Sequence, residues 1–375
     1  MNQKGDSMIV KNDYENTLTN IAASVQKYFS IKPAHNTFVE LDKMLQKYHP
    51  KKVVVILLDG LGANNLKRLL SEDSFLRSHL VCELTTVFPA TTAAATTSLR
   101  TGLNPSEHGY VGWTAYIEPI DKVITLFANA EKGVDGEVCK DFLKVKGDLL
   151  KHETVIEQID KDGNGEAVEI LPFGDGCYCG IDEMFERIVT EAGEPGKKYI
   201  YAYSDEPDTT MHEEGPDSAN VKKMIALYDA KIQELAKELH DTLLIVLADH
   251  GHIKTRTIYL KDYPDVLALM THKTSIDQRA AVFKIKKGKK RAFETLFNKY
   301  FGEYYDLYSA NEVRRSKLFG EGEEHPLFRA ELGDYLAIAK GDVAITAPGD
   351  HYHVSHHAGY TDDEVMVPFV AKYCE

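Results

Sequence analysis

The sequence predicts an α/β protein whose core is a doubly wound, mostly parallel sheet flanked by helices. Residues 51–58, 198–203 and 242–248 are apolar runs typical of strands that are buried in a sheet. Residues 181–191 and 218–240 lie between these runs and carry apolar side chains at spacings of three and four, as amphipathic helices do. Because strands and helices alternate along the chain, we expect helices on both faces of a parallel sheet.

A further apolar strand is expected at residues 80–87. It leads through Pro89 into an alanine-rich segment that ends at Thr101 and is followed by Gly102. Alanine favours helix and glycine commonly follows a helix end, so we expect a helix that begins near Thr91 or Thr92.

Residues 280–331 differ from the rest in pattern. A short strand, AAVFKI, precedes the basic run KKGKK, which we interpret as a solvated turn, and an amphipathic helix follows. We therefore predict a small inserted α/β lobe at 280–331 and a catalytic core made of residues 1–279 and 332–375.

Composition narrows the possible partners. The formal net charge of −14 over 375 residues argues against a protein that wraps nucleic acid. No apolar run reaches the ~18 residues of a membrane span, and residues 1–11 lack the apolar stretch of a secretion signal. We expect a soluble, cytoplasmic protein without a membrane partner, and the sequence does not specify its oligomeric state.

Residues that commonly bind metals recur after the predicted strands and near glycine-rich turns. They are Asp59, Asp208 with His212, Asp249 with His250, and His356 with His357. Carboxylate and imidazole groups are the ligands that zinc and similar divalent ions take, and two ions need about six protein ligands. Asp208 and His212 are four residues apart, so on a helix they share a face. Asp205 is a less favoured substitute for Asp208.

The hydroxyl of Thr91 or Thr92 is the candidate nucleophile. At a helix N-terminus, free backbone N–H groups and the helix dipole favour a phosphoryl group and an alkoxide. The alternative is that both threonines are only N-caps. His252, His351 and His353 are interpreted as ordinary structural or surface histidines.

Five motifs together resemble a known family. ILLDG, FPATT, EPDTTMHEEGP, ADHG and HHAGY occur between residue 55 and about residue 370 in the order found in type I phosphodiesterases/nucleotide pyrophosphatases of the alkaline phosphatase superfamily. The resemblance implies an alkaline-phosphatase-like core and two divalent metal ions, most simply zinc, with manganese as the alternative. It implies one ion held by Asp208, His212 and His357, and a second held by Asp59, Thr92, Asp249 and His250.

The same resemblance selects between neighbouring residues. The family's nucleophile lies nine residues before the threonine of a Thr-Gly turn, here Thr101, and this implies Thr92. His357 is preferred to His356 because it directly precedes Ala-Gly-Tyr. The implied reaction is in-line attack by Thr92 on a small-molecule phosphate ester, followed by hydrolysis of a phosphothreonine intermediate by water.

Substrate class is less closely specified. Arg100 is eight residues beyond Thr92, ~12 Å along the helix, so no arginine clamp for a phosphomonoester is evident. This favours phosphodiesters or pyrophosphates, with a phosphomonoesterase as the main alternative. Ala93 stands where nucleotide-cleaving relatives carry an aromatic residue, so nucleotide specificity is left open.

Three other functions agree less well with the sequence. A dinucleotide-binding oxidoreductase would need a third glycine where Asn65 stands, and Asp59 would repel a pyrophosphate. A non-catalytic metal or phosphate-binding protein is disfavoured because structural zinc sites are usually rich in cysteine. A sulfatase of the superfamily would carry the pattern C/S-x-P-x-R at this helix start, and the chain does not.

Overall fold

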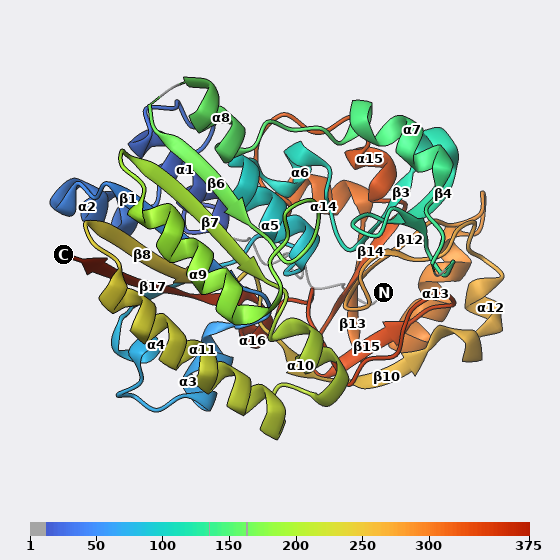
Figure 1. The fold of residues 1–375 in the computed structure, drawn as a ribbon. Coiled ribbons are helices and arrows are strands. Elements are labelled where there is room, and N and C mark those ends of the chain that lie inside the picture. The colour runs from blue at the N-terminus through green and yellow to red at the C-terminus, as the bar shows by residue number, and fades with distance from the viewer. Residues whose placement is uncertain (1–12, 135, 163) are drawn as a thin grey trace.

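A computed structural model describes residues 13–134, 136–162 and 164–375. Figure 1 shows the chain from its N-terminal helices, in blue, to its C-terminal strand, in dark red. The expectation for residues 1–11 falls outside the described residues. Among the residues described, no helix is both long and apolar enough to cross a lipid bilayer.

A six-stranded sheet forms the core of the molecule. Its order is β2 (Leu80–Thr85), β17 (Met366–Cys374), β8 (Thr242–Leu247), β1 (Lys52–Leu58), β7 (Lys198–Ser204) and β6 (Glu166–Ile170). β1 pairs in parallel with β7 and β8, and β6 pairs in parallel with β7. The three central strands are buried along their whole length, which confirms the strands predicted at 51–58, 198–203 and 242–248.

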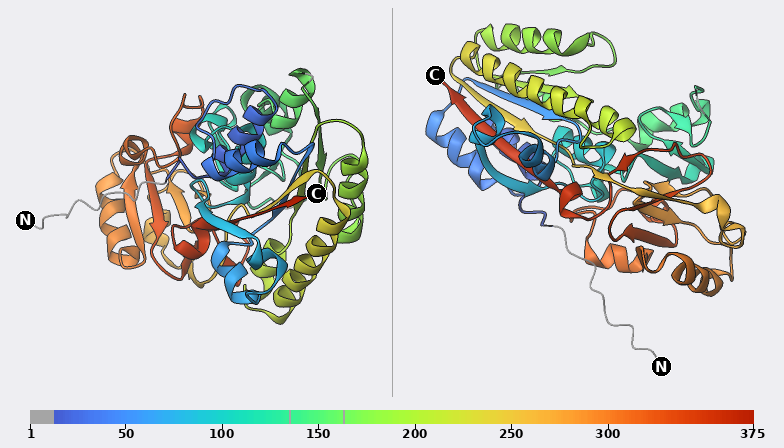
Figure 2. Two further views of the ribbon diagram at one scale, coloured as in Figure 1. Left: turned by 90° about the vertical axis from the view of Figure 1, so that its left-hand side faces the viewer. Right: turned by 90° about the horizontal axis from the view of Figure 1, so that it is seen from below.

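Helices cover both faces of this sheet, as the alternating pattern predicts. α9 (Gly180–Gly193) and α11 (Ala219–Glu238) lie on one face, whereas α1 (Leu18–Tyr28) and α2 (Val39–Tyr48) lie on the other (Figure 2). α5 (Thr92–Thr101) packs against α1 and ends at Gly102, whose φ of 73° suits glycine at a helix end. The doubly wound α/β class is therefore confirmed.

One strand of the core departs from the parallel pattern. β17 is antiparallel to both of its neighbours, β8 and β2. It therefore separates β2, which leads to α5, from the parallel strands of the sheet.

A second, antiparallel sheet lies beside the core on the right of Figure 1. Its order is β13 (Tyr305–Ser309), β14 (Tyr335–Ala339), β12 (Ala280–Phe283), β11 (Ser275–Ile276), β3 (Thr114–Ile117), β4 (Lys122–Thr125) and β5 (Ala130–Glu131). α13 (Lys290–Phe301) packs three phenylalanines into an apolar cluster with β12 and β14. Strands on both sides of the segment 280–331 belong to this sheet, and the lobe boundary itself stays a prediction.

The remaining elements are short or lie at the edges. The helices are α3 (Ala63–Leu69), α4 (Phe75–Ser78), α6 (Pro105–His108), α7 (Lys140–Leu149), α8 (Val155–Asp162), α10 (Asp208–Glu214), α12 (Pro264–Leu267), α14 (Ala310–Ser316), α15 (Phe328–Glu331) and α16 (Asp362–Val365), with 3₁₀ turns at Glu118–Ile120 and Leu260–Asp262. The strands are β9 (Ile253–Lys254), β10 (Arg256–Tyr259), β15 (Val343–Thr346) and β16 (Ser355–His356).

A buried ion pair joins the second sheet to the core. The guanidinium of Arg279, directly before β12, donates to both carboxylate oxygens of Glu364 in α16 at 2.6 and 2.8 Å. Both side chains are fully buried. Glu364 also accepts the backbone N–H of Gly359 at 2.7 Å, two residues beyond His357, so this pair anchors a segment that carries candidate site residues.

Candidate active site

The carboxyl ends of three adjacent parallel strands bring the predicted site residues together. Asp59 follows β1, Asp249 and His250 follow β8, and Asp208 opens α10 just beyond β7. Ligands of open α/β sheets bind at this edge because the strand ends and the loops beyond them form a crevice there. The start of α5 supplies Thr92, α10 supplies His212, and the segment directly after β16 supplies His357.

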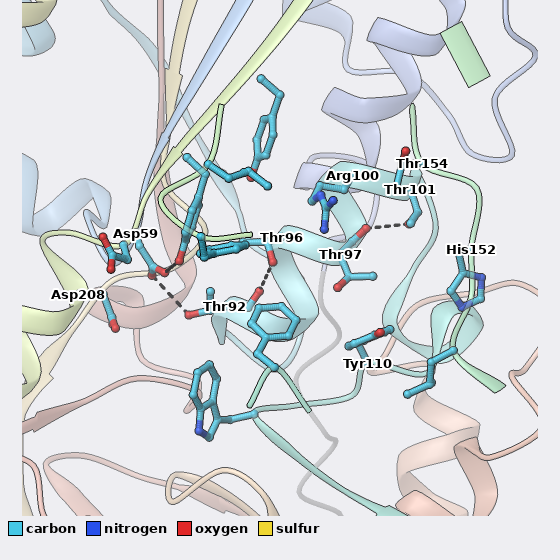
Figure 3. Close-up of a pocket in the computed structure, with 18 of the residues that line it drawn as sticks. Asp59, Thr92, Thr96, Thr97, Arg100, Thr101, Tyr110, His152, Thr154 and Asp208 are labelled. Atoms are coloured by element: carbon cyan, nitrogen blue, oxygen red, sulfur yellow. Dashed lines mark hydrogen bonds between the residues drawn. The ribbon is translucent and has the colours of Figure 1, made fainter. Parts of the chain in front are cut away.

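The hydroxyl of Thr92 lies inside this cluster. Its Oγ1 donates to Asp59 Oδ1 at 3.4 Å and lies 3.2 Å from His250 Nε2. His250 Nε2 is 3.2 Å from Asp59 Oδ1 and 3.7 Å from Asp249 Oδ2. Figure 3 shows Asp59, Thr92 and Asp208 close together at one end of a pocket. Asp59, Asp249 and His250 thus form one group with the spacing of metal ligands.

A second group surrounds Asp208. Its Oδ1 lies 3.5 Å from Nε2 of His212, 3.9 Å from Nε2 of His357 and 4.0 Å from Nε2 of His250. The ligand atoms of Asp208, His250, His252 and His357 all lie within 4.8 Å of one another. His250 belongs to both groups, so the two groups are directly adjacent.

Backbone carbonyls orient the predicted histidines. In each ring Nδ1 lies within hydrogen-bond distance of a carbonyl oxygen, which must accept, so Nδ1 carries the proton. The pairs are His212 with Ser355 (2.9 Å), His250 with Gly251 (3.2 Å) and His357 with Ala90 (3.0 Å). Nε2 of each ring then faces the aspartates, which is the arrangement of metal-ligating histidines.

Burial shifts the pKa of several side chains in this site. Burial, reinforced by the neighbouring aspartates, raises the pKa of Asp59 and Asp249 well above the usual range of a carboxyl group. Burial lowers the pKa of His357 well below its usual value. Asp249 Oδ2 is buried and has no hydrogen-bond partner among the described residues. Oxygen and imidazole donors with a free acceptor fit divalent cations.

The structure distinguishes between neighbouring candidate residues that the sequence pattern alone did not distinguish. Thr91 Oγ1 donates to Asp277 Oδ2 at 3.2 Å, so this hydroxyl bonds outside the Asp59 group. His356 uses both ring nitrogens on polar side chains, Thr255 at 2.6 Å and Gln278 at 3.0 Å. Asp205 is exposed to solvent. Thr92, His357 and Asp208 are the members of these pairs that face the cluster.

A pocket of about 600 Å³ extends from the cluster along α5. Thr92, Thr96, Thr97 and Thr101 line it from one helix face, so it spans about 13 Å of helix. Aromatic rings line it as well, namely those of Tyr110, Trp113, Phe127, Phe173, Tyr201 and Tyr203. Figure 3 places Arg100, Thr101, His152 and Thr154 at the end opposite Asp59 and Asp208.

Two residues near the cluster were not assigned a role by the sequence analysis. The hydroxyl of Tyr203 donates to Asp59 Oδ2. His252 is buried and its Nε2 lies 2.5 Å from Asp208 Oδ1, although the sequence interpretation treated it as an ordinary histidine. The motif ADHGH contained a signal, because His252 is only two residues beyond His250 and shares its turn. Tyr203 carries no comparable signal, since tyrosines are common in this chain.

Comparison with known proteins identifies the family. The model of the type I phosphodiesterase/nucleotide pyrophosphatase family matches residues 53–165 and 180–361. A comparison with curated protein sequences gives no match.

Solved structures of ectonucleotide pyrophosphatase/phosphodiesterase 5 share the fold. An inactive murine variant in which a threonine is replaced by alanine, in complex with AMP, has a TM-score of 0.62 and 20% sequence identity. The human protein has a TM-score of 0.63 and 20% identity. Each comparison covers 85% of this chain and 87% of the other. Because the family match spans most of its length, the chain belongs to the type I phosphodiesterase/nucleotide pyrophosphatase family of the alkaline phosphatase superfamily and is a phosphoric ester hydrolase.

Proposed function

We propose that this protein hydrolyses small phosphodiesters or pyrophosphates, with Thr92 as the nucleophile and two divalent metal ions as cofactors. The observation that carries the proposal is the place of the Thr92 hydroxyl, within 3.4 Å of Asp59 and 3.2 Å of His250 at the start of α5. The inactivity of the murine relative's threonine-to-alanine variant supports a threonine in this role.

The two ligand groups described above would hold the ions. One ion would be held by Asp208, His212 and His357, and the other by Asp59, Thr92, Asp249 and His250. Zinc best fits this set of oxygen and imidazole donors, and manganese is the alternative. When bound, the ions would supply positive charge that lowers the pKa of a hydroxyl and stabilises negative charge on phosphoryl oxygens.

Thr92 would carry out the reaction in two steps. In the first, Oγ1 gives up its proton to solvent and attacks phosphorus. A bond forms between Oγ1 and phosphorus while the bond from phosphorus to the leaving oxygen breaks. In the second step water attacks phosphorus, the bond from phosphorus to Oγ1 breaks, and Oγ1 takes up the proton that the water gives up. The first backbone N–H groups of α5 favour the phosphoryl oxygens because they precede the hydrogen bonds of the helix, which begin at Ala94.

The surroundings of the pocket favour diesters over monoesters. A phosphomonoester carries an additional negative charge, which an arginine clamp near the nucleophile would stabilise. Arg100 instead forms two hydrogen bonds with Glu169, at 2.8 and 2.9 Å, and lies near the opposite end of the pocket. The aromatic lining suits a leaving group or ester substituent with a flat ring, such as the nucleoside of the AMP bound by the murine relative.

Replacement of the nucleophile tests the mechanism. Thr92→Ala should lower turnover of bis-p-nitrophenyl phosphate by at least about a thousandfold, since covalent catalysis is lost. Metal content, measured by mass spectrometry, should stay near that of the wild type because six of the seven proposed ligands remain. Thr91→Ala is the matched control and should retain activity. An active Thr92→Ala enzyme would show that Thr92 is not the nucleophile.

A panel of substrates tests the ester class. Purified protein, with and without chelator, is assayed on p-nitrophenyl phosphate, bis-p-nitrophenyl phosphate, a nitrophenyl ester of a nucleoside 5′-monophosphate, and p-nitrophenyl sulfate. The highest kcat/KM should be found with one of the two diesters, and chelator should abolish it. Faster turnover of p-nitrophenyl phosphate would make the protein a phosphomonoesterase.

A further inference from the structure

His252 is placed like a ligand although the family resemblance assigns it no role. It follows the Asp-His-Gly turn beyond β8, and its side chain is completely buried. Its Nε2 is 2.5 Å from Asp208 Oδ1, which is nearer to that oxygen than His212 at 3.5 Å or His357 at 3.9 Å. It belongs with Asp208, His250 and His357 to the group whose ligand atoms lie within 4.8 Å of one another.

The hydrogen bonds around Ser355 determine which nitrogen of His252 carries a proton. The Ser355 hydroxyl donates its single hydrogen to the carbonyl oxygen of Met211 at 2.5 Å. It can therefore only accept from His252 Nδ1, which is 3.0 Å away. Nδ1 must be the protonated nitrogen, and Nε2 of the neutral ring presents a lone pair to Asp208.

This arrangement is the same as that of the predicted histidines. His212 also directs Nδ1 at Ser355, through its backbone carbonyl, and directs Nε2 at Asp208. A lone pair and a carboxylate oxygen at 2.5 Å repel one another unless a cation or a proton lies between them. Ser355 thus fixes two imidazole rings around one aspartate from the outer side of the cluster.

We propose that His252 Nε2 is a fourth protein ligand of the ion held by Asp208, His212 and His357. The proposal rests on the two-ion centre of the proposed function. One carboxylate and three imidazoles would give this ion four protein ligands, and zinc can accept a further oxygen as a fifth ligand during the reaction.

Metal titration of the full-length apoprotein tests this assignment. Co²⁺ serves as the probe, with binding followed by calorimetry and coordination number by visible absorption. His252→Ala should weaken the affinity of one of the two ions by at least about 100-fold, the upper range for loss of a group that only supports a ligand. The absorption of that ion should also change, because a four-coordinate ion loses a protein ligand. Ser355→Ala should weaken the same ion by about 10-fold or more.

Controls separate the possible outcomes. His353→Ala is the matched control, because its ring lies 4.2 Å from that of His212 but, unlike His212 and His252, it forms no ion pair with Asp208 among the described residues, and it should bind both ions normally. His252→Gln, compared by circular dichroism, serves as a second variant if the alanine variant does not fold. Wild-type affinity and spectrum in a folded His252 variant would overturn the proposal and leave His252 a hydrogen-bond partner of Asp208. Fewer than two bound ions in the wild type would instead contradict the proposed function.

Discussion

The buried pair of Arg279 and Glu364 provides the sharpest test of how the site is supported. Arg279→Met keeps most of the side-chain volume but removes the guanidinium, which also donates to the carbonyl oxygens of Gly341 and Val343 at 2.8 and 2.6 Å. Glu364 would then stay buried as an unpaired carboxylate. Removing one partner of a buried ion pair typically lowers stability by about 3–5 kcal/mol.

The remaining contacts of Glu364 place the expected loss within that range. The carboxylate keeps hydrogen bonds from the N–H groups of Gly359 and Thr361 and from the Thr361 hydroxyl, at 2.7, 3.1 and 2.7 Å. These donors offset part of the lost interaction, so we expect the free energy of unfolding to fall by about 3 kcal/mol. Because Gly359 is two residues from His357, affinity for divalent ions should fall as well.

Urea unfolding followed by circular dichroism measures the effect. Arg256 and Asp342 form a matched control, because their two-point ion pair has similar distances of 3.1 and 3.0 Å but is exposed. Arg256→Met should change stability by less than about 1 kcal/mol. The double variant Arg279→Met/Glu364→Gln should lose less stability than the sum of the losses in the two single variants, because no unpaired charge remains in it. If Arg279→Met were no more destabilising than Arg256→Met, the reasoning on burial would be wrong.

Two further predictions concern a buried carboxyl group and a close backbone contact. Glu331 is fully buried, neither of its carboxyl oxygens has a hydrogen-bond partner in the described chain, and burial raises its pKa well above the usual range. The folded state therefore favours the protonated carboxyl group. The stability that this gives is present below the unfolded-state pKa and is lost as pH rises through the folded-state pKa. Glu331→Met should raise the free energy of unfolding at pH 7 by about 1–3 kcal/mol. In urea titrations, the stability of the variant should also fall less steeply than that of the wild type above about pH 4. The same pH dependence in both proteins would argue against an unfavourably buried carboxyl group at this position. Gly251→Ala should lower the melting temperature and the affinity for divalent ions, because its Cβ would overlap the Asp363 carbonyl oxygen. Gly147→Ala, where a Cβ meets nothing within 4 Å, is the control, and equal melting temperatures for the two variants would contradict this steric argument.

Local sequence patterns predicted the parallel core well. The strands at 52–58, 198–204 and 242–247 are mostly apolar in sequence and buried along their whole length, so they can be recognised without a distant partner. The helix from Thr92 to Thr101 was equally clear, because alanine-rich sequence and Gly102 mark its extent. The residues at the strand ends followed from this, since the carboxyl ends of parallel strands meet at one edge.

Features that depend on distant contacts were not predictable in the same way. β17 was not predicted, since its antiparallel direction is determined by where the chain returns to the sheet. The second sheet was predicted only in part, because β3, β4 and β5 join it from a segment about 150 residues before β12. His252 was given no role because ring orientation depends on Ser355, which is 103 residues away in sequence. Such contacts join residues that are far apart in sequence, so a local sequence pattern does not indicate them.

The position of β17 has a consequence for the order in which the protein can be assembled during synthesis. Within the described structure β2 is joined to the rest of its sheet only through residues 366–370 of β17. A ribosome therefore makes the strand that precedes Thr92 nearly 300 residues before the strand that holds it in place. The nascent enzyme should stay inactive, with β2 unpaired and open to chaperones, until residues 366–370 have left the ribosome.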